Sequence, residues 1–434
     1  STSKSEKVEF ILQSRINNLP GKIEGYCRAS PFVEEFFLGH HRKMQNTRIL
    51  LVENIHIVAQ ERLQELGAQV TRISHAPSEK ELVELLPNYD VIGIRSKTEL
   101  TAKALSSNPK IMSVGCFCIG TNQVDLIYAN QLGIPVFNAP HSNTRSVAEL
   151  VIAEMIALSR QLGDRNNLAH QGGWMKSAEG SREVRGKTVG IVGYGHIGSQ
   201  VSVLAEAMGM KVLFFDVIKK LPLGNASSCS SLVELLQRSD FVTLHVPETP
   251  QTKDMISAKE LAHMKKGACL INASRGTVVD IEDLAKAILE KHLGGCAVDV
   301  FPEEPASNKE KFFSPLQNLP NVILTPHIGG STEEAQYAIG LEVAESFSRF
   351  IATGTTSGAV NFPQVDLPRA QGSCRILNVH RNEPGVLGEI NSVVSKFGAN
   401  ILAQTLSTDP KIGYLVMDVE RADAGPLGDE IGAL

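Results

Sequence analysis

The fold of this chain is decided by residues 189–198, which read Val-Gly-Ile-Val-Gly-Tyr-Gly-His-Ile-Gly. The apolar run Val189 to Val192 predicts a buried strand, and residues 197–208 predict a helix that begins directly after the glycines. Glycine permits a tight turn here and close packing of the helix on the strand. A strand, a glycine-rich turn and a helix in this order indicate the first βα unit of a doubly wound parallel sheet.

Short apolar runs alternate with helical patterns on both sides of this turn. Such alternation predicts parallel sheets with helices on both faces. Because the turn comes late, near residue 190, we expect its domain to be inserted within another domain that flanks it. The predicted strands lie at 49–52, 70–73, 91–94, 111–114 and 134–137, and then at 189–192, 212–215, 241–244, 269–272, 296–300 and 322–324.

Two long amphipathic helices, at 142–162 and 332–352, are predicted to border the inserted domain. Residues 353–372 are rich in glycine, proline, threonine and serine, which is typical of a linker. A strand, a helix and a hairpin-like pair of strands follow, and they predict a small third α+β domain.

Bulk composition excludes several classes of protein. A formal net charge of -5 and a pI of about 6.2 argue against nucleic-acid binding, which needs a clustered basic excess. No apolar run approaches the roughly 18 residues of a membrane span, and residues 1–10 do not resemble a secretory signal. Seven cysteines in 434 residues do not make a disulfide framework, so we expect reduced thiols in the cytoplasm, Cys116 and Cys118 among them. His40 and His41 lack a third metal ligand, and no metal site is predicted.

The glycine-rich turn has the residues that a bound dinucleotide requires. Gly193 and Gly195 allow close approach of the backbone, and Gly198 lets the helix pack on the strand. The free N–H groups of the helix N-terminus suit a pyrophosphate. Asp216, at the end of the next strand, is placed to bind a ribose 2′-hydroxyl and to repel a 2′-phosphate, which favours NAD over NADP. The lysines at 219–220 weaken that preference a little.

Three polar residues each follow a predicted strand of the same sheet: Arg275, Glu304 and His327. Because ligands of such sheets bind beyond the carboxyl ends of the strands, we expect all three to face the nicotinamide. A histidine paired with a carboxylate can move a proton near neutral pH, and arginine offers a planar fork to a carboxylate or carbonyl oxygen. Taken singly, each could be a surface or turn residue. Glu303 competes with Glu304, and the residue pattern does not separate them.

Several further segments complete a recognisable set of motifs. With these the chain resembles the D-isomer-specific 2-hydroxyacid dehydrogenases, and most closely the members that act on 3-phospho-D-glycerate and carry a C-terminal ACT domain. The resemblance covers roughly residues 47–420. Its motifs are Gly-Cys-Phe-Cys-Ile-Gly-Thr-Asn at 115–122, Gly-Tyr-Gly-His-Ile-Gly at 193–198, Leu-His-Val-Pro at 244–247, Asn-Ala-Ser-Arg-Gly at 272–276, Asp-Val-Phe-Pro-Glu-Glu-Pro at 299–305 and Thr-Pro-His-Ile-Gly-Gly at 325–330.

The resemblance implies the fold class and the site residues. It implies an α/β fold, with a Rossmann-like cofactor domain at 143–329 inserted in a flavodoxin-like substrate domain at 47–142 and 330–365, preceded by an N-terminal arm at 1–46 and followed by an α+β ACT domain at 373–434. It assigns catalysis to Arg275, Glu304 and His327, and prefers Glu304 to Glu303. The implied cofactor contacts are Gly193, Gly195, His196, Ile197, Gly198, Asp216, Ala273, Ser274, Arg275, Asp299, His327, Ile328, Gly329 and Gly330. The implied substrate contacts are Arg95, Ser96 and Asn143.

The resemblance also implies the reaction, which is NAD-dependent oxidation of 3-phospho-D-glycerate to 3-phosphohydroxypyruvate on the route to L-serine. Two alternatives stay open. A glyoxylate or hydroxypyruvate reductase would share the catalytic residues but does not usually carry a third domain. An NAD-sensing corepressor would also keep them, and long recruitment segments would favour it.

The ACT-like region implies regulation and assembly. His380, Asn382 and Asn400 match serine-binding positions, so we expect feedback inhibition by L-serine. We expect a dimer through the cofactor domain, with Trp174 as an anchor, and a tetramer if ACT domains also pair. One feature departs from the βαββαβ pattern: a final strand is not evident after Val419.

Overall fold

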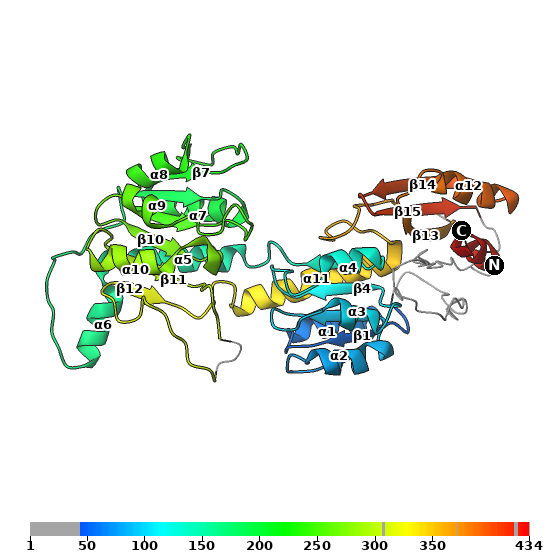
Figure 1. The fold of residues 1–434 in the computed structure, drawn as a ribbon, viewed down its shortest axis with the longest axis horizontal. Coiled ribbons are helices and arrows are strands. Elements are labelled where there is room, and N and C mark those ends of the chain that lie inside the picture. Colours follow the sequence, from blue (N-terminus) through cyan, green and yellow to red (C-terminus); the bar gives the residue numbers. More distant parts are fainter. Residues whose placement is uncertain (1–43, 306–308, 371, 421–423, 434) are drawn as a thin grey trace. The chain divides into compact units, whose positions relative to one another are not determined.

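The computed structural model describes residues 44–305, 309–370, 372–420 and 424–433. The chain divides into two compact units, whose elements are labelled in Figure 1. Unit 1 holds the chain up to Pro140 and from Tyr337 onward, and unit 2 runs from His141 to Gln336. The predicted N-terminal arm lies outside the described residues except for its last three positions. The predicted domain boundaries stay predictions.

Unit 1 contains a five-stranded parallel sheet in the order β2-β1-β3-β4-β5, the flavodoxin-like order. The helices begin at side chains suited to capping, such as Ser78, whose hydroxyl and Glu81 form a reciprocal capping box. The strands are β1 (Arg48–Leu51), β2 (Gln69–Arg72), β3 (Val91–Ile94), β4 (Ser113–Cys116) and β5 (Val136–Asn138). The helices are α1 (Ile57–Glu65), α2 (Glu79–Leu85), α3 (Ala102–Ser106), α4 (Leu126–Gln131) and α11 (Glu333–Thr353).

Unit 2 contains a seven-stranded parallel sheet in the order β12-β11-β10-β9-β6-β7-β8. The order reverses between β6 and β9, which is where such sheets bind ligands. The strands are β6 (Thr188–Val192), β7 (Lys211–Phe215), β8 (Ser227–Ser228), β9 (Phe241–Leu244), β10 (Cys269–Asn272), β11 (Gly295–Val298) and β12 (Val322–Leu324). The helices are α5 (Thr144–Arg160), α6 (Leu162–His170), α7 (His196–Ala207), α8 (Leu232–Arg238), α9 (Ala258–His263) and α10 (Ile281–Leu289).

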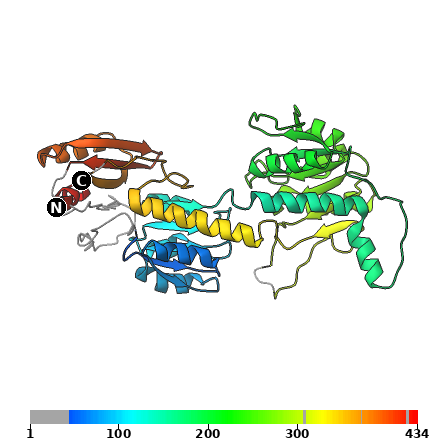
Figure 2. The same ribbon diagram turned by 180° about the vertical axis from the view of Figure 1, so that it is seen from behind.

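The two long helices each cover a sheet of their own unit, as Figure 2 shows from behind. In unit 2, α5 packs against β10, β11, β12 and α7. In unit 1, the side chains of α11 that are buried include Val343 and Phe347, which pack in one core with β1 and β3. The predicted α/β class with two doubly wound sheets is confirmed. The two-residue strand β8 and the helix α6 were not predicted.

The small C-terminal region is an antiparallel sheet in the order β13-β15-β14 with two helices, as predicted for a small α+β unit. Its strands are longer than the apolar runs that predicted them. After β15, the described residues form a helix and no strand. The elements are β13 (Cys374–Arg381), α12 (Val386–Lys396), β14 (Ile401–Thr408), β15 (Ile412–Val419) and α13 (Ala424–Ala433).

The segment predicted as a linker contributes buried residues to an apolar core. Thr356 is fully buried, and Phe362 and Val365 belong to the core that packs on the five-stranded sheet of unit 1. One face of the small sheet adds Leu377 and Tyr414 to the same core. Within unit 1, the small domain is therefore packed on the five-stranded sheet through a shared apolar core.

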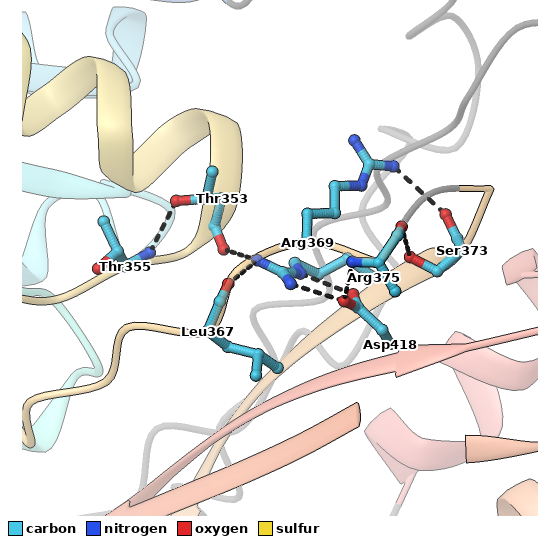
Figure 3. Close-up of polar contacts among 8 residues, drawn as sticks. Thr353, Thr355, Leu367, Arg369, Ser373, Arg375 and Asp418 are labelled. Atoms are coloured by element: carbon cyan, nitrogen blue, oxygen red, sulfur yellow. Dashed lines mark hydrogen bonds and ion pairs between the residues drawn. The ribbon is translucent and has the colours of Figure 1, made fainter. Parts of the chain in front are cut away.

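A buried ion pair secures this junction (Figure 3). The guanidinium of Arg375 donates two hydrogen bonds to the carboxylate of Asp418, both at 2.7 Å, and neither side chain is exposed. The same guanidinium donates to the carbonyl oxygens of Thr353 at 2.9 Å and Leu367 at 2.8 Å. Arg375 thus joins two strands of the small sheet to the end of α11 and to the connecting segment.

Candidate active site

The parallel strands of unit 2 end in register. Val192 pairs with Leu244, which pairs with Asn272, and Val298 and Leu324 continue the row across β11 and β12. Each loop that leaves the carboxyl end of a strand therefore starts at the same edge of the sheet. The glycine-rich turn, Arg275, Asp299 and His327 all lie on loops at this edge.

Glycine is required at two positions of the turn. Gly193 has a φ of +90°, and a Cβ atom there would lie 2.3 Å from the carbonyl oxygen of His245. A Cβ atom on Gly198 would lie 2.1 Å from the carbonyl oxygen of Gly193. The helix can approach the strand this closely only without side chains.

The N-terminus of α7 suits a dinucleotide. Its cap residue, Gly195, contributes no capping side chain, and a Cβ atom on it would meet nothing within 4 Å. At the end of β7, the carboxylate of Asp216 accepts hydrogen bonds from the backbone N–H groups of Tyr194 and Ile218, both at 2.8 Å. Free helix N–H groups, open space at Gly195 and an oriented carboxylate fit the pyrophosphate and ribose of NAD.

One aromatic neighbour of this turn was missed from the sequence. The ring of His141 lies against the ring of His196, the first residue of α7, with centroids 3.8 Å apart. No sequence motif marks His141 as part of the site. Its place depends on how the start of unit 2 returns to the sheet.

His327 and Glu304 form a pair, with His327 Nδ1 2.9 Å from Glu304 Oε2. The backbone N–H of Phe301 also donates to Glu304, at 3.2 Å. Glu303 makes no hydrogen bond to His327 among the described interactions. The choice of Glu304 over its neighbour therefore has geometric support.

The pair shifts both pKa values in opposite directions. The hydrogen bond from Glu304 raises the pKa of His327, against burial, and the charges of Glu304 and Asp299 add to the rise. Burial alone would raise the pKa of Glu304, but the bond with His327 and the positive charges of His327 and Arg275 outweigh it and lower that pKa. The imidazolium form is favoured, which extends proton donation to higher pH.

Arg275 lies on a loop shaped by Asn272. The side-chain amide of Asn272 donates to the carbonyl of Arg275 at 3.0 Å, and its oxygen accepts from the backbone and hydroxyl of Ser274. The guanidinium of Arg275 donates to the carbonyl of Ser274 at 2.7 Å, and its charge reaches both Glu304 and His327. Asn272 was not predicted as a site residue, although it shapes the loop that carries two predicted contacts.

The loop that carries His327 is held by Asp299. The Asp299 carboxylate accepts from the hydroxyl of Thr325 at 2.6 Å and from the N–H groups of Ile328 and Gly329, both at 2.8 Å. His327 itself has a φ of +53°, an unfavourable conformation for a residue with a side chain. Asp299 was predicted as a cofactor contact, and its carboxylate is engaged with the catalytic loop.

Arg95 and Ser96 belong to unit 1, on the loop after β3. The buried Glu53 holds this loop, because its carboxylate accepts from the N–H groups of Arg95, Lys97 and Thr98 at 2.7–3.1 Å. Gln123 donates to the carbonyl of Arg95 at 2.9 Å. The loop is therefore preformed, by two side chains that sequence reasoning had not singled out.

Asn143 belongs to unit 2 and precedes α5. Its side-chain nitrogen would lie 2.3 Å from a Cβ atom on Gly330, so the two residues are neighbours. Its Oδ1 atom is buried and has no hydrogen-bond partner among the described residues. A buried acceptor of this kind beside the catalytic loop is suited to a ligand.

The predicted effector residues lie in and around the first strand and the helix of the small domain. Burial lowers the pKa of His380, whose Nδ1 lies 2.8 Å from Asn378 Oδ1. The amide of Asn382 donates to the carbonyl of Asp409 at 2.8 Å. Asn400 is exposed, and its carbonyl accepts from Glu420 at the end of β15.

Three further features of the described chain concern membranes, metals and thiols. No helix there is long and apolar enough to cross a membrane. In the same residues, no three potential ligands cluster as a metal site and no disulfide bond is formed. Burial raises the pKa of Cys116, as expected for a core thiol.

Comparison with known proteins agrees with this site. Residues 152–329 match the NAD-binding domain of D-isomer-specific 2-hydroxyacid dehydrogenases, and residues 376–428 match an ACT domain of the type found in the AHAS small subunit. A D-lactate dehydrogenase from Aquifex aeolicus, solved with NAD and lactic acid, is 30% identical with a TM-score of 0.61. That match covers 70% of this chain and 95% of the other. The chain belongs to the D-isomer-specific 2-hydroxyacid dehydrogenases.

Two relatives that are more similar in sequence place the chain in the D-3-phosphoglycerate dehydrogenase family within this class. A D-3-phosphoglycerate dehydrogenase from Dictyostelium discoideum is 52% identical over 89% of this chain and 95% of its own length. One from Haemophilus influenzae is 53% identical over 88% of this chain and 93% of its own length. The chain is thus similar to these enzymes along nearly their whole length, and it is an NAD-dependent oxidoreductase.

Proposed function

We propose that the protein oxidises 3-phospho-D-glycerate to 3-phosphohydroxypyruvate with NAD. The single observation that carries the chemistry is the His327–Glu304 pair, at 2.9 Å, on the edge of the sheet that holds the dinucleotide turn. The relatives that share almost the full length supply the substrate.

The cofactor-binding residues act by holding and orienting. The turn at Gly193, the N-terminus of α7 and the carboxylate of Asp216 would hold the pyrophosphate and ribose. When bound, NAD supplies the nicotinamide ring that accepts the hydride. Loops after β10, β11 and β12, from Ala273 to Arg275 and from His327 to Gly330, would border that ring.

His327 moves the proton. Since Nδ1 is paired with Glu304, Nε2 is the ring nitrogen left for the substrate. In oxidation, the neutral ring would accept the hydroxyl proton at Nε2 as C2 becomes a carbonyl. Glu304 stabilises the imidazolium that results. In reduction, the imidazolium returns the proton to the oxygen.

The remaining site residues orient the substrate. Arg275 would hold the C1 carboxylate or the developing carbonyl oxygen with its planar fork. Asn143 offers a buried side chain beside Gly330, and Arg95 and Ser96 stand on a loop that Glu53 keeps in shape. A phosphate and a carboxylate are the groups that such residues recognise.

We also propose that L-serine inhibits the enzyme through the small domain. His380 and Asn382 lie at and just after the end of β13, before the N-terminus of α12, which can bind a carboxylate. Asn400 follows α12 and lies at the opposite end of the small sheet, at the edge where β13 starts, so the structure does not bring it together with the other two. Arg375 ties that domain to the end of α11, so that a change in the small sheet reaches the sheet that carries Arg95.

Assembly as a dimer through unit 2, working in the cytoplasm, is part of the same proposal. Trp174 is 87% exposed, and Leu162 and Met175 expose more than half of their surface nearby along α6 and the loop after it. Exposed large apolar side chains on one segment support burial against a second copy. Pairing of ACT domains would give a tetramer.

The test is NADH absorbance at pH about 8.5, with NAD, 3-phospho-D-glycerate, a carbonyl trap for the product and then L-serine. Turnover suppressed by serine supports both proposals. Turnover indifferent to serine keeps the reaction and removes the effector. Turnover of glyoxylate but not of 3-phosphohydroxypyruvate with NADH moves the substrate to another 2-oxo acid, and NAD binding without turnover of any of them favours an NAD-sensing binding protein.

A further inference from the structure

A carboxylic acid occupies a core position on α5. The buried side chains of this helix include Val147, Val151 and Leu158, which recur at helical spacing and face the sheet. Glu154 falls on the same stripe and is only 3% exposed. A carboxylate at such a position needs hydrogen-bond donors or a cation, since an unpaired buried charge is costly.

No such partner is present among the described residues. Both carboxyl oxygens of Glu154 are buried and make no hydrogen bond there. The charge that reaches Glu154 is that of Asp299, which is negative, and the thiol of Cys296 on β11 lies within reach of Glu154 as well. Burial raises the pKa of Glu154 to about 8, and Asp299 adds to the rise.

No positive charge contributes to the pKa shift of Glu154, although the charge of Arg182, whose backbone N–H donates to Ser159 of α5, reaches Cys269. The nearest titratable group of β10 is the thiol of Cys269, whose pKa burial raises to about 12, and β12 is wholly apolar. The titratable residues of α7, His196 and Glu206, are at its two ends. At neutral pH the stable state of Glu154 is therefore the protonated, uncharged acid.

Asp299 connects Glu154 to the catalytic loop. Asp299 is itself only 2% exposed. Its carboxylate oxygens accept hydrogen bonds from Thr325, Ile328 and Gly329, which lie on either side of His327. A Cβ atom on Gly329 would lie 3.0 Å from Asp299 and 3.5 Å from Val147, so α5 lies directly against this loop.

We propose that Glu154 is a positioning residue that works in its uncharged form: it lets the Asp299 anion hold the His327 loop, and its ionisation loosens that loop. A second negative charge near Asp299 would repel the Asp299 carboxylate and weaken its hydrogen bonds to the loop. Activity would then fall at alkaline pH for a reason separate from the titration of His327. The kinetic half of this inference rests on the proposed function.

The experiment compares wild type with Glu154→Gln, which is uncharged at every pH. Glu154→Met is a second uncharged variant, in case the buried amide disturbs folding. Glu149→Gln is the matched control, because Glu149 lies on the same helix but is exposed and paired with Arg145. For each protein, kcat and KM are measured from pH about 6 to 10 in both directions, and melting temperature over the same range.

The expected kinetic result is a difference in kcat between Glu154→Gln and wild type that appears only at high pH. Near pH 6.5 Glu154→Gln should match wild-type kcat within about two-fold, while near pH 9.5 it should be faster by roughly three-fold or more, with KM little changed. Its melting temperature should rise relative to wild type by roughly 5 °C between these pH values, because the native wild type resists losing the Glu154 proton and the unfolded chain does not. Glu149→Gln should show neither effect.

Two results would overturn the proposal. One is an alkaline limb that is the same in wild type and in both Glu154 variants. The other is a loss of kcat near pH 6.5 in both variants at unchanged melting temperature, which would mean that the carboxyl group acts in another way. The melting arm needs no turnover, so a wrong substrate and a wrong role for Glu154 give different outcomes.

Discussion

Two pairs of opposite charge, one in each unit, differ in what surrounds them. The side chains of His327 and Glu304 are 53% and 37% exposed, whereas those of Arg375 and Asp418 are fully buried. The distances are similar, at 2.9 and 2.7 Å. The first pair can exchange protons with substrate and water, and the second cannot exchange anything without unfolding. Exposure, more than geometry, separates a pair that performs chemistry from a pair that holds structure.

The largest effect is expected from His327→Ala. It removes the proton donor and acceptor, so kcat should fall by roughly 10³-fold or more in both directions. The melting temperature should barely change, because half-exposed pairs add little stability. A variant that keeps more than a tenth of wild-type kcat would remove His327 from the mechanism, and steady-state kinetics in both directions decides this.

The second largest effect is expected from Arg375→Met, and it is a loss of folding stability instead of a loss of kcat. It leaves Asp418 buried and uncompensated and should lower the free energy of unfolding by about 3–5 kcal/mol. Urea unfolding measures it. The double variant Arg375→Met with Asp418→Leu should recover most of the loss, since it removes the unpaired charge. A single variant as stable as wild type would show that the junction does not depend on the pair.

A smaller effect is expected from Glu304→Gln, which keeps the shape of the side chain and removes its charge. The hydrogen bond and charge of Glu304 raise the pKa of His327, so the variant should have a lower histidine pKa. Reduction needs imidazolium, so its alkaline limb should move to lower pH. Oxidation needs neutral imidazole, so its acid limb should also move to lower pH. We expect kcat for reduction at pH about 8 to fall roughly 10- to 100-fold; pH profiles that do not move would break the assignment.

The smallest effect is expected from Glu149→Gln, which breaks an exposed ion pair on α5. Arg145 and Glu149 are 2.5 Å apart, yet both side chains are about 60% exposed. The free energy of unfolding should change by less than about 0.5 kcal/mol, with kcat unchanged. A loss comparable to that of Arg375→Met would contradict the argument that burial sets the cost of breaking a pair.

Sequence reasoning predicted most of the strands and residues at the catalytic edge of the sheet, but not the side chains that hold its loops in place. The strands at 241–244, 269–272 and 322–324 were predicted at their observed bounds, because buried parallel strands are short apolar runs between polar turns. Glu53, Asn272 and His141 were missed. Glu53 and His141 act on residues that are close to them only in the folded chain, and no periodicity reports such contacts. Asn272 stands inside the motif at 272–276, but the hydrogen bonds by which it shapes the loop are visible only in the structure.

The sequence by itself determined the order of strands and helices, the glycine turn and the identity of the residues at the strand ends. These follow from local hydrophobic pattern, from steric needs at Gly193 and Gly198, and from motifs read in order. The tertiary structure alone decided that Arg375 is buried with Asp418 and that Glu154 has no hydrogen-bond partner among the described residues. Such properties depend on which distant side chains share one small, poorly solvated space, and only folding brings them there.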